Sequence, residues 1–457
     1  MEQSMERSMR SYPPRPTVLT LFAGLALAAL AALHPTARAA DWPQWRGPNF
    51  NGSSEATGLP DAIGKDQNAL WTATLPGPSN GTPILHGDRV FTTALDPDST
   101  KLLAICLDRK DGKILWQKEA GIGFIQKGEN NMATPSPVTD GKTVWFLFGT
   151  GDLAAFDYDG KQLWARNLQK EVGAFNIMWI YGSSPLLYKG KLYVQVLHRD
   201  RSYRDTALPG AAGWDGPAPS LLLALDPATG KELWRQARPD EAVDETKESY
   251  ATPIPHTTSA GRDEIILIGG DAVTGHDAET GKELWRFTGW NPRKVASWRL
   301  VPSVVTGAGV ILACAPKGGP VMAIREDGSG DISDSHLLWK SEEFTSDVAV
   351  PLFYRGHFYV LDTRAKSLNR VDPKTGRVTW STRLGGAADM RASPTGADGK
   401  VYCMNANGDV WVVSADNGEV LHKTSLGGVR WSRGSPAVTD GMVVIRSGEA
   451  LYAFGKK

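Results

Sequence analysis

A nine-residue string that closes with tryptophan decides the fold of this chain: DPATGKELW at 226–234 and DAETGKELW at 277–285. The string returns with small changes as DRKDGKILW at 108–116 and DPKTGRVTW at 372–380. Self-similarity at intervals of roughly 40 to 55 residues is typical of repeat architectures. Shorter or looser copies are DYDGKQLW ending at Trp164, SDSHLLW ending at Trp339, ADNGEVLH ending at His422 and ALWTATLPG around Trp71.

A second phrase precedes each closing string, in which a Ser-Pro or Thr-Pro pair is followed by a turn. Examples are GTPILHGDRVF at 81–91, TPSPVTDGKTVWF at 134–146 and SPAVTDGMVVI at 435–445. Asp-Gly and Thr-Gly pairs supply the positive φ angles that tight hairpin turns need. Each module therefore reads as four short strands, and four-stranded units at this period predict a β-propeller.

The number of closing positions predicts the number of blades. The C-terminal segment 435–454 contains three strands without a closing fourth, and the strand near 70–75 has no upstream partners. Pairing these two segments would close the ring and remove exposed sheet edges. We therefore expect an all-β chain that forms a single eight-bladed propeller of four-stranded antiparallel blades, closed by its N-terminal strand. The closing tryptophans would act as spacers between blades: Trp71, Trp116, Trp164, Trp234, Trp285, Trp339 and Trp380.

The first 39 residues are expected to be an export signal and not part of the fold. Three arginines precede an apolar run at 18–33, and Ala37-Arg38-Ala39 resembles a cleavage site. The run is shorter than the roughly 20 residues of a spanning helix, although an uncleaved anchor remains the alternative. We expect a signal peptide at 1–39, an extension packed on the propeller at 40–67, and the propeller at 68–457, with an insertion at 199–220 in blade 3.

Composition narrows the possible partners. The 50 basic and 50 acidic residues leave no positive surplus, which argues against nucleic-acid binding. Cys106, Cys314 and Cys403 each lie in an apolar run, so buried thiols are expected and not disulfides. The histidines show no metal-ligand spacing, and DGSGDISD at 327–334 lacks the glycine and glutamate of a calcium loop. No metal site is predicted.

The repeat resembles a known family. The pattern S-P-x-x-x-D-G followed by A-L-D-x-x-T-G-K-x-L-W resembles the PQQ-like β-propeller repeat, which quinoprotein alcohol dehydrogenases share with the propeller protein of the outer-membrane barrel-assembly machinery. DWPQWRGPNFNGSS at 41–54 and REDGSGDISDSHLLW at 325–339 resemble a subgroup of exported bacterial members. The export signal predicts a periplasmic or extracellular protein, with no transmembrane segment once the signal is removed.

Two functions follow from that resemblance. One is a PQQ-dependent dehydrogenase of alcohols or sugars, whose cofactor typically lies between an adjacent-cysteine disulfide and a tryptophan, beside calcium. The other is a binding or scaffolding propeller without catalysis. Because this chain has no adjacent cysteine pair, we expect the second. No cofactor is assigned, and PQQ with calcium belongs only to the alternative.

The segments that enter each innermost strand should surround the central funnel. They contain aromatic and guanidinium side chains that suit stacking and the recognition of carboxylates or sugars. The alternative is that these tryptophans pack the blade tops and the charges pair across the funnel. An envelope protein or a small polar ligand would be the partner, and the chain is expected to be a monomer. The predicted ligand-binding residues are Asn131, Trp179, Tyr181, Glu248, Tyr250, Trp298, Arg299, Asp389, Arg391, Trp431 and Arg433.

Overall fold

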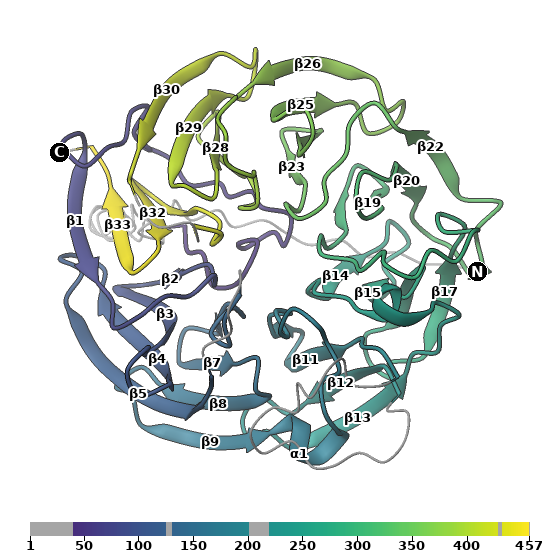
Figure 1. Cartoon of the computed structure of the whole chain (residues 1–457), viewed down its shortest axis with the longest axis horizontal. Coiled ribbons are helices and arrows are strands. Elements are labelled where there is room, and N and C mark those ends of the chain that lie inside the picture. The colour runs from purple at the N-terminus through teal and green to yellow at the C-terminus, as the bar shows by residue number, and fades with distance from the viewer. Residues whose placement is uncertain (1–39, 125–129, 201–218, 428–431, 457) are drawn as a thin grey trace, which may run out of the picture. The chain divides into compact units, whose positions relative to one another are not determined.

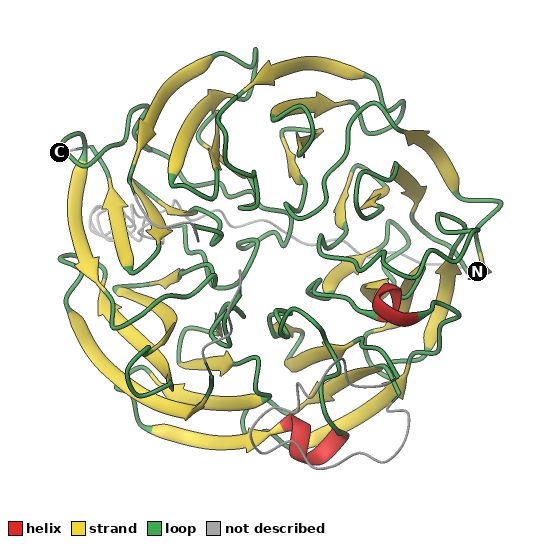
Figure 2. Cartoon of the chain, viewed as in Figure 1, coloured by secondary structure: helices red, strands yellow, loops and turns green. Residues whose placement is uncertain are grey.

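Eight antiparallel sheets, one for each repeat, stand around a central axis (Figures 1 and 2). The computed structural model describes residues 40–124, 130–200, 219–427 and 432–456. Within these residues helix is confined to α1 (Leu168–Val172) and the 3-10 turn η1 (Asp244–Lys247). The all-β, eight-bladed prediction is confirmed.

The first four blades follow one another along the chain, each with its innermost strand first. Blade 1 is β2 (Ile84–His86), β3 (Arg89–Leu95), β4 (Lys101–Asp108) and β5 (Ile114–Ile122); blade 2 is β6 (Val138–Thr139), β7 (Thr143–Leu147), β8 (Asp152–Asp157) and β9 (Gln162–Asn167). Blade 3 is β10 (Leu186–Tyr188), β11 (Lys191–Val196), β12 (Leu221–Leu225) and β13 (Glu232–Ala237); blade 4 is β14 (Ile254–Thr257), β15 (Asp263–Gly269), β16 (Ala272–Asp277) and β17 (Glu283–Phe287).

The last four blades complete the ring. Blade 5 is β18 (Val305–Gly307), β19 (Val310–Cys314), β20 (Val321–Arg325) and β22 (Leu337–Ser341); blade 6 is β23 (Leu352–Tyr354), β24 (His357–Asp362), β25 (Ser367–Val371) and β26 (Val378–Arg383). Blade 7 is β27 (Thr395–Ala397), β28 (Lys400–Met404), β29 (Asp409–Ser414) and β30 (Val420–Ser425); blade 8 is β31 (Ala437–Thr439), β32 (Met442–Ser447), β33 (Ala450–Phe454) and β1 (Ala69–Thr74).

The two ends of the chain close the ring as predicted. The N-terminal strand β1 pairs antiparallel with β33, with Trp71 opposite Ala453 and Thr74 opposite Ala450. Figure 1 shows the purple β1 lying along the outside of the yellow β33. Because β1 is the outer strand of the last blade, the ring is held shut by a sheet that both ends of the chain build.

The repeat tryptophans pack against the turn of the following blade. A Cβ added to Gly230 would lie 2.7 Å from the Trp164 ring, and the Trp164 indole donates to the Pro227 carbonyl oxygen at 2.9 Å. The same contact between a ring and a turn glycine joins five further pairs: Trp71 with Gly112, Trp116 with Gly160, Trp234 with Gly281, Trp339 with Gly376 and Trp380 with Gly418. These glycines have positive φ, so the T-G-K turn both forms the hairpin and leaves room for a neighbouring indole. The string that predicted the fold therefore contains both halves of the contact between blades.

Two junctions depart from this arrangement. At the closure, His422 replaces tryptophan, and its Nε2 lies 2.9 Å from the carbonyl oxygen of Ile63, beside Gly64. Trp285 is buried instead, and its indole donates to the Glu264 carboxylate at 2.8 Å. The longer turn of blade 5 also adds the short strand β21 (Gly330–Asp331) in parallel to the outer edge of blade 4.

The N-terminal segment 40–68, which we call the strap, crosses the face of the ring where the innermost strands end. The backbone of Trp42 pairs with Leu85 of blade 1, and the Thr139 amide of blade 2 donates to the Pro43 carbonyl oxygen. Further along, the strap pairs with blade 7 through Ser53. Contacts with blades on both sides of the axis place the strap across the end of the central channel.

The predicted signal peptide at 1–39 lies outside the described residues. The insertion falls between β11 and β12 of blade 3, and its residues 201–218 also lie outside them. Within the described residues, no helix is long and apolar enough to cross a membrane. The three cysteines are free and buried in strands β4, β19 and β28, and burial raises the pKa of the Cys106 and Cys314 thiols to about 12.

A buried histidine in blade 4 takes part in a chain of hydrogen bonds that keeps it neutral. His276 is fully buried, with Nδ1 2.9 Å from the Gly281 carbonyl oxygen and Nε2 3.0 Å from the Thr274 hydroxyl. The carbonyl accepts from Nδ1–H, so Nε2 accepts from Thr274, whose oxygen in turn accepts from Arg238 at 3.0 Å. Burial lowers the pKa of His276 from 6.5 to about 4, because a second ring proton would face the hydroxyl beside a guanidinium.

This histidine should make stability fall in mild acid. The native pKa lies below the unfolded value, so the stabilisation is complete above pH 6.5 and is lost as the pH falls towards 4. Between pH 7.5 and 4.5 the loss from His276 should be about 2.5 kcal/mol. His276→Asn should lower stability at pH 7.5 but reduce the difference between the two pH values by about that amount. Urea unfolding at both pH values measures this, and an unchanged difference would contradict the assignment of the neutral ring.

Candidate ligand-binding site on the propeller axis

A ring of hydroxyl side chains lines the axis at the Ser-Pro and Thr-Pro positions of the repeat. The Thr82 amide donates to the Ser136 hydroxyl at 2.9 Å, and the Ser136 amide donates to Ser184 at 2.9 Å. Each amide thus reaches the side chain of the next blade, and the Ser435 amide returns to Thr82 at 3.0 Å. We call these residues the hydroxyl ring: Thr82, Ser136, Ser184, Thr252, Ser303, Ser393 and Ser435, with Val350 at the blade 6 position.

The ring explains why the repeat places serine or threonine at this position, which precedes proline in six of the seven cases and Val304 in the case of Ser303. These side chains are almost fully buried, and a buried amide without an acceptor costs about 1–3 kcal/mol. Val350 has no hydroxyl, and among the described residues nothing accepts from the Ser303 amide. The ring is therefore broken at one junction, between blades 5 and 6.

Two isosteric substitutions test the ring. Thr252→Val removes the acceptor of the Ser184 amide, now at 2.9 Å, and should lower the free energy of unfolding by about 1–3 kcal/mol. Val350→Thr supplies the missing acceptor for Ser303 and should raise it by about 0.5–1.5 kcal/mol. Chemical denaturation of both variants measures the two effects. If both variants changed the free energy of unfolding by the same small amount and in the same direction, the hydroxyl ring would not stabilise the fold.

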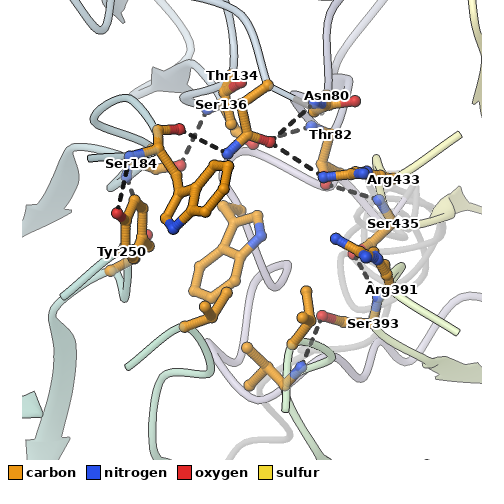
Figure 3. Close-up of a pocket in the computed structure, with 18 of the residues that line it drawn as sticks. Asn80, Thr82, Thr134, Ser136, Ser184, Tyr250, Arg391, Ser393, Arg433 and Ser435 are labelled. Atoms are coloured by element: carbon orange, nitrogen blue, oxygen red, sulfur yellow. Dashed lines mark hydrogen bonds between the residues drawn. The ribbon is translucent and has the colours of Figure 1, made fainter. Parts of the chain in front are cut away.

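A second ring of side chains lies two residues before each hydroxyl position. Side chains in an extended segment alternate with a period of two, so residues i and i−2 face the same side. Together the rings line a cavity of about 470 Å³ on the axis, which we call the axial pocket (Figure 3). The upper ring consists of Asn80, Thr134, Gly182, Tyr250, Val301, Val348, Arg391 and Arg433, in blade order.

Basic side chains outnumber acidic ones in the pocket wall. Arg299, Lys317, Arg391 and Arg433 line it, with Glu245 as the acidic lining residue. Several of these charges form ion pairs. The Lys317 ammonium lies 3.6 Å from the Glu245 carboxylate. At the rim, Arg299 lies 3.3 Å from Asp347, and Arg391 lies 2.9 Å from Asp389. The pocket wall is therefore polar and cationic, and its charges are partly held by carboxylates just outside it.

The half-exposed Trp179 stands in the pocket wall on a loop that a buried carboxylate fixes. Glu248 is completely buried and accepts from the Tyr250 hydroxyl at 2.6 Å and from the Met178 amide at 3.0 Å. The Tyr250 oxygen accepts from the Trp179 amide at 3.1 Å. Burial raises the pKa of Glu248, and the adjacent Glu248 further raises that of the desolvated Tyr250.

The backbone next to Trp179 is strained. Ile180 has a φ of 73°, which is unfavourable for a β-branched residue and costs of the order of 1–3 kcal/mol. The hydrogen bonds of Glu248 and Tyr250 hold the loop in this conformation, and the Trp179 indole donates to Glu245 at 3.2 Å. Trp179 is 45% exposed, so a large aromatic face is available to a ligand.

The structure brings some of the predicted funnel residues into the pocket and turns others away. Residues that line it are Trp179, Tyr250, Arg299, Arg391 and Arg433. Asn131 donates to the Pro78 carbonyl oxygen, Tyr181 is buried with its hydroxyl on Gln195, and Trp298 packs against a core cluster. Glu248 and Asp389 lie behind the lining as partners of Tyr250 and Arg391, and Trp431 lies outside the described residues.

The missed lining residues carry a signal that the repeat contains. Asn80, Thr134, Val301 and Val348 occupy the i−2 position, so the hydroxyl ring and the strand period together would have found them. Trp45 also lines the pocket, but it comes from the strap. Its position depends on where the strap crosses the axis, and no repeat pattern predicts that.

The described residues do not offer a metal site. Among them, no group of three or more histidine, cysteine, aspartate or glutamate side chains is placed to hold a metal ion. Glu245 is the acidic side chain in the pocket wall, and it lies close to Lys317 and Arg299. The carboxylate in the described pocket wall therefore faces two cations, which disfavours calcium beside a quinone there.

Enzymes are among the relatives of this chain by sequence. It is 24% identical over 238 residues to a polyvinylalcohol dehydrogenase of Pseudomonas sp, over 47% of this chain and 35% of that protein. It is 25% identical over 307 residues to the tetrathionate hydrolase of Acidithiobacillus ferrooxidans, over 66% of this chain and 53% of that protein. The chain thus spans about a third to a half of the length of these relatives.

Solved propellers of two kinds share the fold. The quinohemoprotein alcohol dehydrogenase from Comamonas testosteroni matches with a TM-score of 0.63 and 14% identity, over 92% of this chain and 81% of that one. BamB from Moraxella catarrhalis matches with a TM-score of 0.58 and 13% identity, over 85% of this chain and 97% of that one. The profile of the family described as outer membrane protein assembly factor BamB matches residues 62–194, 218–336 and 330–457, and the chain therefore belongs to this family of PQQ-like propellers.

Proposed function

We propose that the chain is an exported, periplasmic binding or scaffolding propeller that holds a small polar ligand in its axial pocket. One observation carries the proposal. Side chains from all eight blades converge on one cavity of about 470 Å³, which falls within the usual size of small-molecule sites. Its wall combines guanidinium and amide groups with an exposed indole, which is the chemistry that recognises carboxylates and sugars.

Scaffolding is compatible with the same pocket. The family description and the BamB structure concern an assembly factor, and a propeller presents two broad faces around its axis. An envelope protein that docks on the pocket face would use the same arginines. The chain is proposed to act as a monomer, because the closed ring leaves each blade complete.

A dehydrogenase is the alternative, and the relatives named as polyvinylalcohol and quinohemoprotein alcohol dehydrogenases favour it. The arginines and Trp179 would suit a planar polycarboxylate such as PQQ. The carboxylates do not suit calcium, for the reason given above. The cysteines lie apart in blades 1, 5 and 7, so they do not form the disulfide that the dehydrogenase resemblance implies. We therefore favour binding without redox chemistry.

Calorimetry and a dye-linked assay separate these functions. Purified protein should bind at least one of gluconate, glucose, succinate or hexanoate saturably, and it should not reduce a dye with alcohols or sugars when PQQ and calcium are present. Arg433→Gln should weaken the binding at least tenfold. Arg355→Gln, which removes an exposed arginine paired with Asp416, should leave it unchanged.

Two results would overturn the proposal. Submicromolar binding of PQQ with calcium, accompanied by turnover, would establish the dehydrogenase. Failure of every ligand in the panel would remove the small-molecule site, and docking of an envelope protein would then have to be sought on the blade faces.

A further inference from the structure

The eight upper-ring positions are not chemically equivalent around the axis. Blades 7, 8 and 1 contribute Arg391, Arg433 and Asn80, whereas blades 5 and 6 contribute Val301 and Val348. Because the blades follow one another around the ring (Figure 1), blades 8, 1 and 2 lie across the axis from blades 4, 5 and 6. The axial pocket therefore has a polar arc on blades 7, 8, 1 and 2 and an apolar arc on blades 5 and 6. Blades 1 and 2 face the valines across the axis, whereas Arg391 of blade 7 lies beside Val348 of blade 6.

The polar arc is a connected hydrogen-bonding surface. Asn130 of blade 2 lies at its centre, where its side-chain oxygen accepts from Arg433 at 3.2 Å and from Asn80 at 3.3 Å. Its amide group donates to the Trp179 carbonyl oxygen at 2.8 Å. Figure 3 shows Asn80, Arg433 and Arg391 on the same side of the cavity. A carboxylate placed on this arc would meet the Arg433 guanidinium, the Asn80 amide and the Arg391 guanidinium, which also contacts Asp389 at 2.9 Å.

The apolar arc is formed where the hydroxyl ring is interrupted. Val350 takes the hydroxyl position in blade 6, and Val348 stands above it in the upper ring. Val301 of blade 5 continues the arc, and Trp45 of the strap also lines the pocket. At seven blades the sequence places serine or threonine in the lower ring, so valine at blade 6 removes a polar group from one side of the pocket only.

The nearby charges do not make this arc polar. Arg299 at the rim of blade 5 is paired with Asp347, whose Oδ2 lies 3.3 Å from Nη2. Lys317 lies 3.6 Å from Glu245, and its amide donates to Asp347 at 2.8 Å. Carboxylates therefore neutralise the charges of Arg299 and Lys317 above the valines. The wall that a ligand meets at Val301 and Val348 is aliphatic.

The strap contributes to the pocket wall at the face that it crosses. Arg46 is buried and donates to the carbonyl oxygens of Pro394 at 2.9 Å and of Pro351 at 2.7 Å, in blades 7 and 6. Burial without a carboxylate partner lowers its pKa to about 9. Arg46 thus anchors the strap beside Trp45, which lines the pocket.

From this arrangement we infer that the axial pocket binds a small amphipathic carboxylate, with its carboxylate on the arc of Arg433, Arg391, Asn80 and Asn130 and its hydrocarbon on the arc of Val301, Val348 and Val350. The inference rests on the proposed function and names the ligand class. A chain that threads through the ring would meet the strap, so the ligand is a small molecule or the end of a longer one.

Three probes with six carbon atoms test the two arcs separately. Hexanoate has both a carboxylate and a hydrocarbon, hexanol lacks the charge, and gluconate lacks the hydrocarbon. Titration calorimetry of the full chain should show saturable hexanoate binding, at least tenfold tighter than binding of either of the other two.

Variants assign each arc. Arg433→Gln should weaken hexanoate at least tenfold without changing hexanol. The isosteric double change Val348→Thr with Val350→Thr should weaken hexanoate about tenfold and leave gluconate unchanged or tighter. The second of these threonines restores the hydroxyl ring, so this variant should be at least as stable as the parent. Arg355→Gln serves as the matched control.

The outcomes separate this inference from the proposed function. If gluconate binds more tightly than hexanoate, the polarity assigned to the pocket is wrong while small-molecule binding stands. If PQQ with calcium supports turnover, the proposed function fails whatever hexanoate does. If hexanoate binds but neither variant weakens it, the site lies elsewhere and the inference is overturned.

Discussion

A chain that starts at Pro76 is expected to lose the closed ring and to form oligomers or aggregates. It lacks β1, which pairs with β33 from Ala69 opposite Phe454 to Thr74 opposite Ala450. The loss exposes the whole outer edge of β33, and an unpaired flat edge is a template for association. The truncation also removes Trp71, which is part of β1, so the indole that covers Gly112 of blade 1 is lost.

Size-exclusion chromatography with light scattering and circular dichroism measure this effect. A matched control chain that starts at Ala40 keeps the strap and β1, and it should remain monomeric with the spectrum of the whole chain. A peptide spanning 40–75, added to the truncated chain during refolding, should restore the monomer in part. A monomeric, cooperatively unfolding chain from Pro76 would show that the closure does not hold the ring together.

The fold could be predicted from the sequence because each repeat carries both halves of a contact. The turn glycine of one blade receives the tryptophan of the blade before it, as at Gly230 and Trp164. A pattern that recurs for this reason reports the blade count directly. The departure at Trp285 was not predictable from the repeat, because its indole bonds to Glu264 in its own blade and the longer turn of blade 5 adds β21 to the blade 4 sheet.

The site was predictable only in part, and the reason lies in side-chain direction. Glu248 and Tyr250 were both expected at the funnel, and both share the two-residue phase of Thr252 in the hydroxyl ring, but only Tyr250 lines the pocket. Glu248 lies in the interior, where it fixes the Trp179 loop. Trp45 depends on a tertiary crossing of the strap, which no local pattern encodes. The sequence therefore indicates which segments reach the axis, whereas tertiary contacts decide the side chains further from the hydroxyl ring: Glu248 is in phase but buried, and Trp179 is out of phase but lines the pocket.

Arg446 joins the last blade to the first at the closure of the ring. It is 1% exposed, and its guanidinium donates to the Thr92 hydroxyl at 2.9 Å and to the carbonyl oxygens of Thr93 at 2.5 Å and Gly77 at 2.8 Å. A fourth bond reaches the Gly448 carbonyl oxygen at 3.1 Å. Burial lowers the pKa of Arg446 from 12.5 to about 9, which corresponds to about 5 kcal/mol of unfavourable desolvation. Hydrogen bonds to charged groups contribute about 1.5–3 kcal/mol each, so four of them outweigh that cost.

Arg446→Met should therefore lower the free energy of unfolding by about 3–5 kcal/mol, because it removes all four hydrogen bonds of the guanidinium and leaves buried carbonyl groups of blade 1 without donors. Arg446→Lys keeps a charge but reaches fewer acceptors, so its free energy of unfolding should lie between those of Arg446→Met and the parent. Arg355→Met removes an exposed arginine that pairs with Asp416 at 2.9 Å, and it should change stability by less than about 1 kcal/mol. Guanidinium unfolding of the three variants measures the differences. A loss from Arg446→Met no larger than that from Arg355→Met would show that the desolvation cost of Arg446 cancels its hydrogen bonds, and that other contacts hold blade 8 to blade 1.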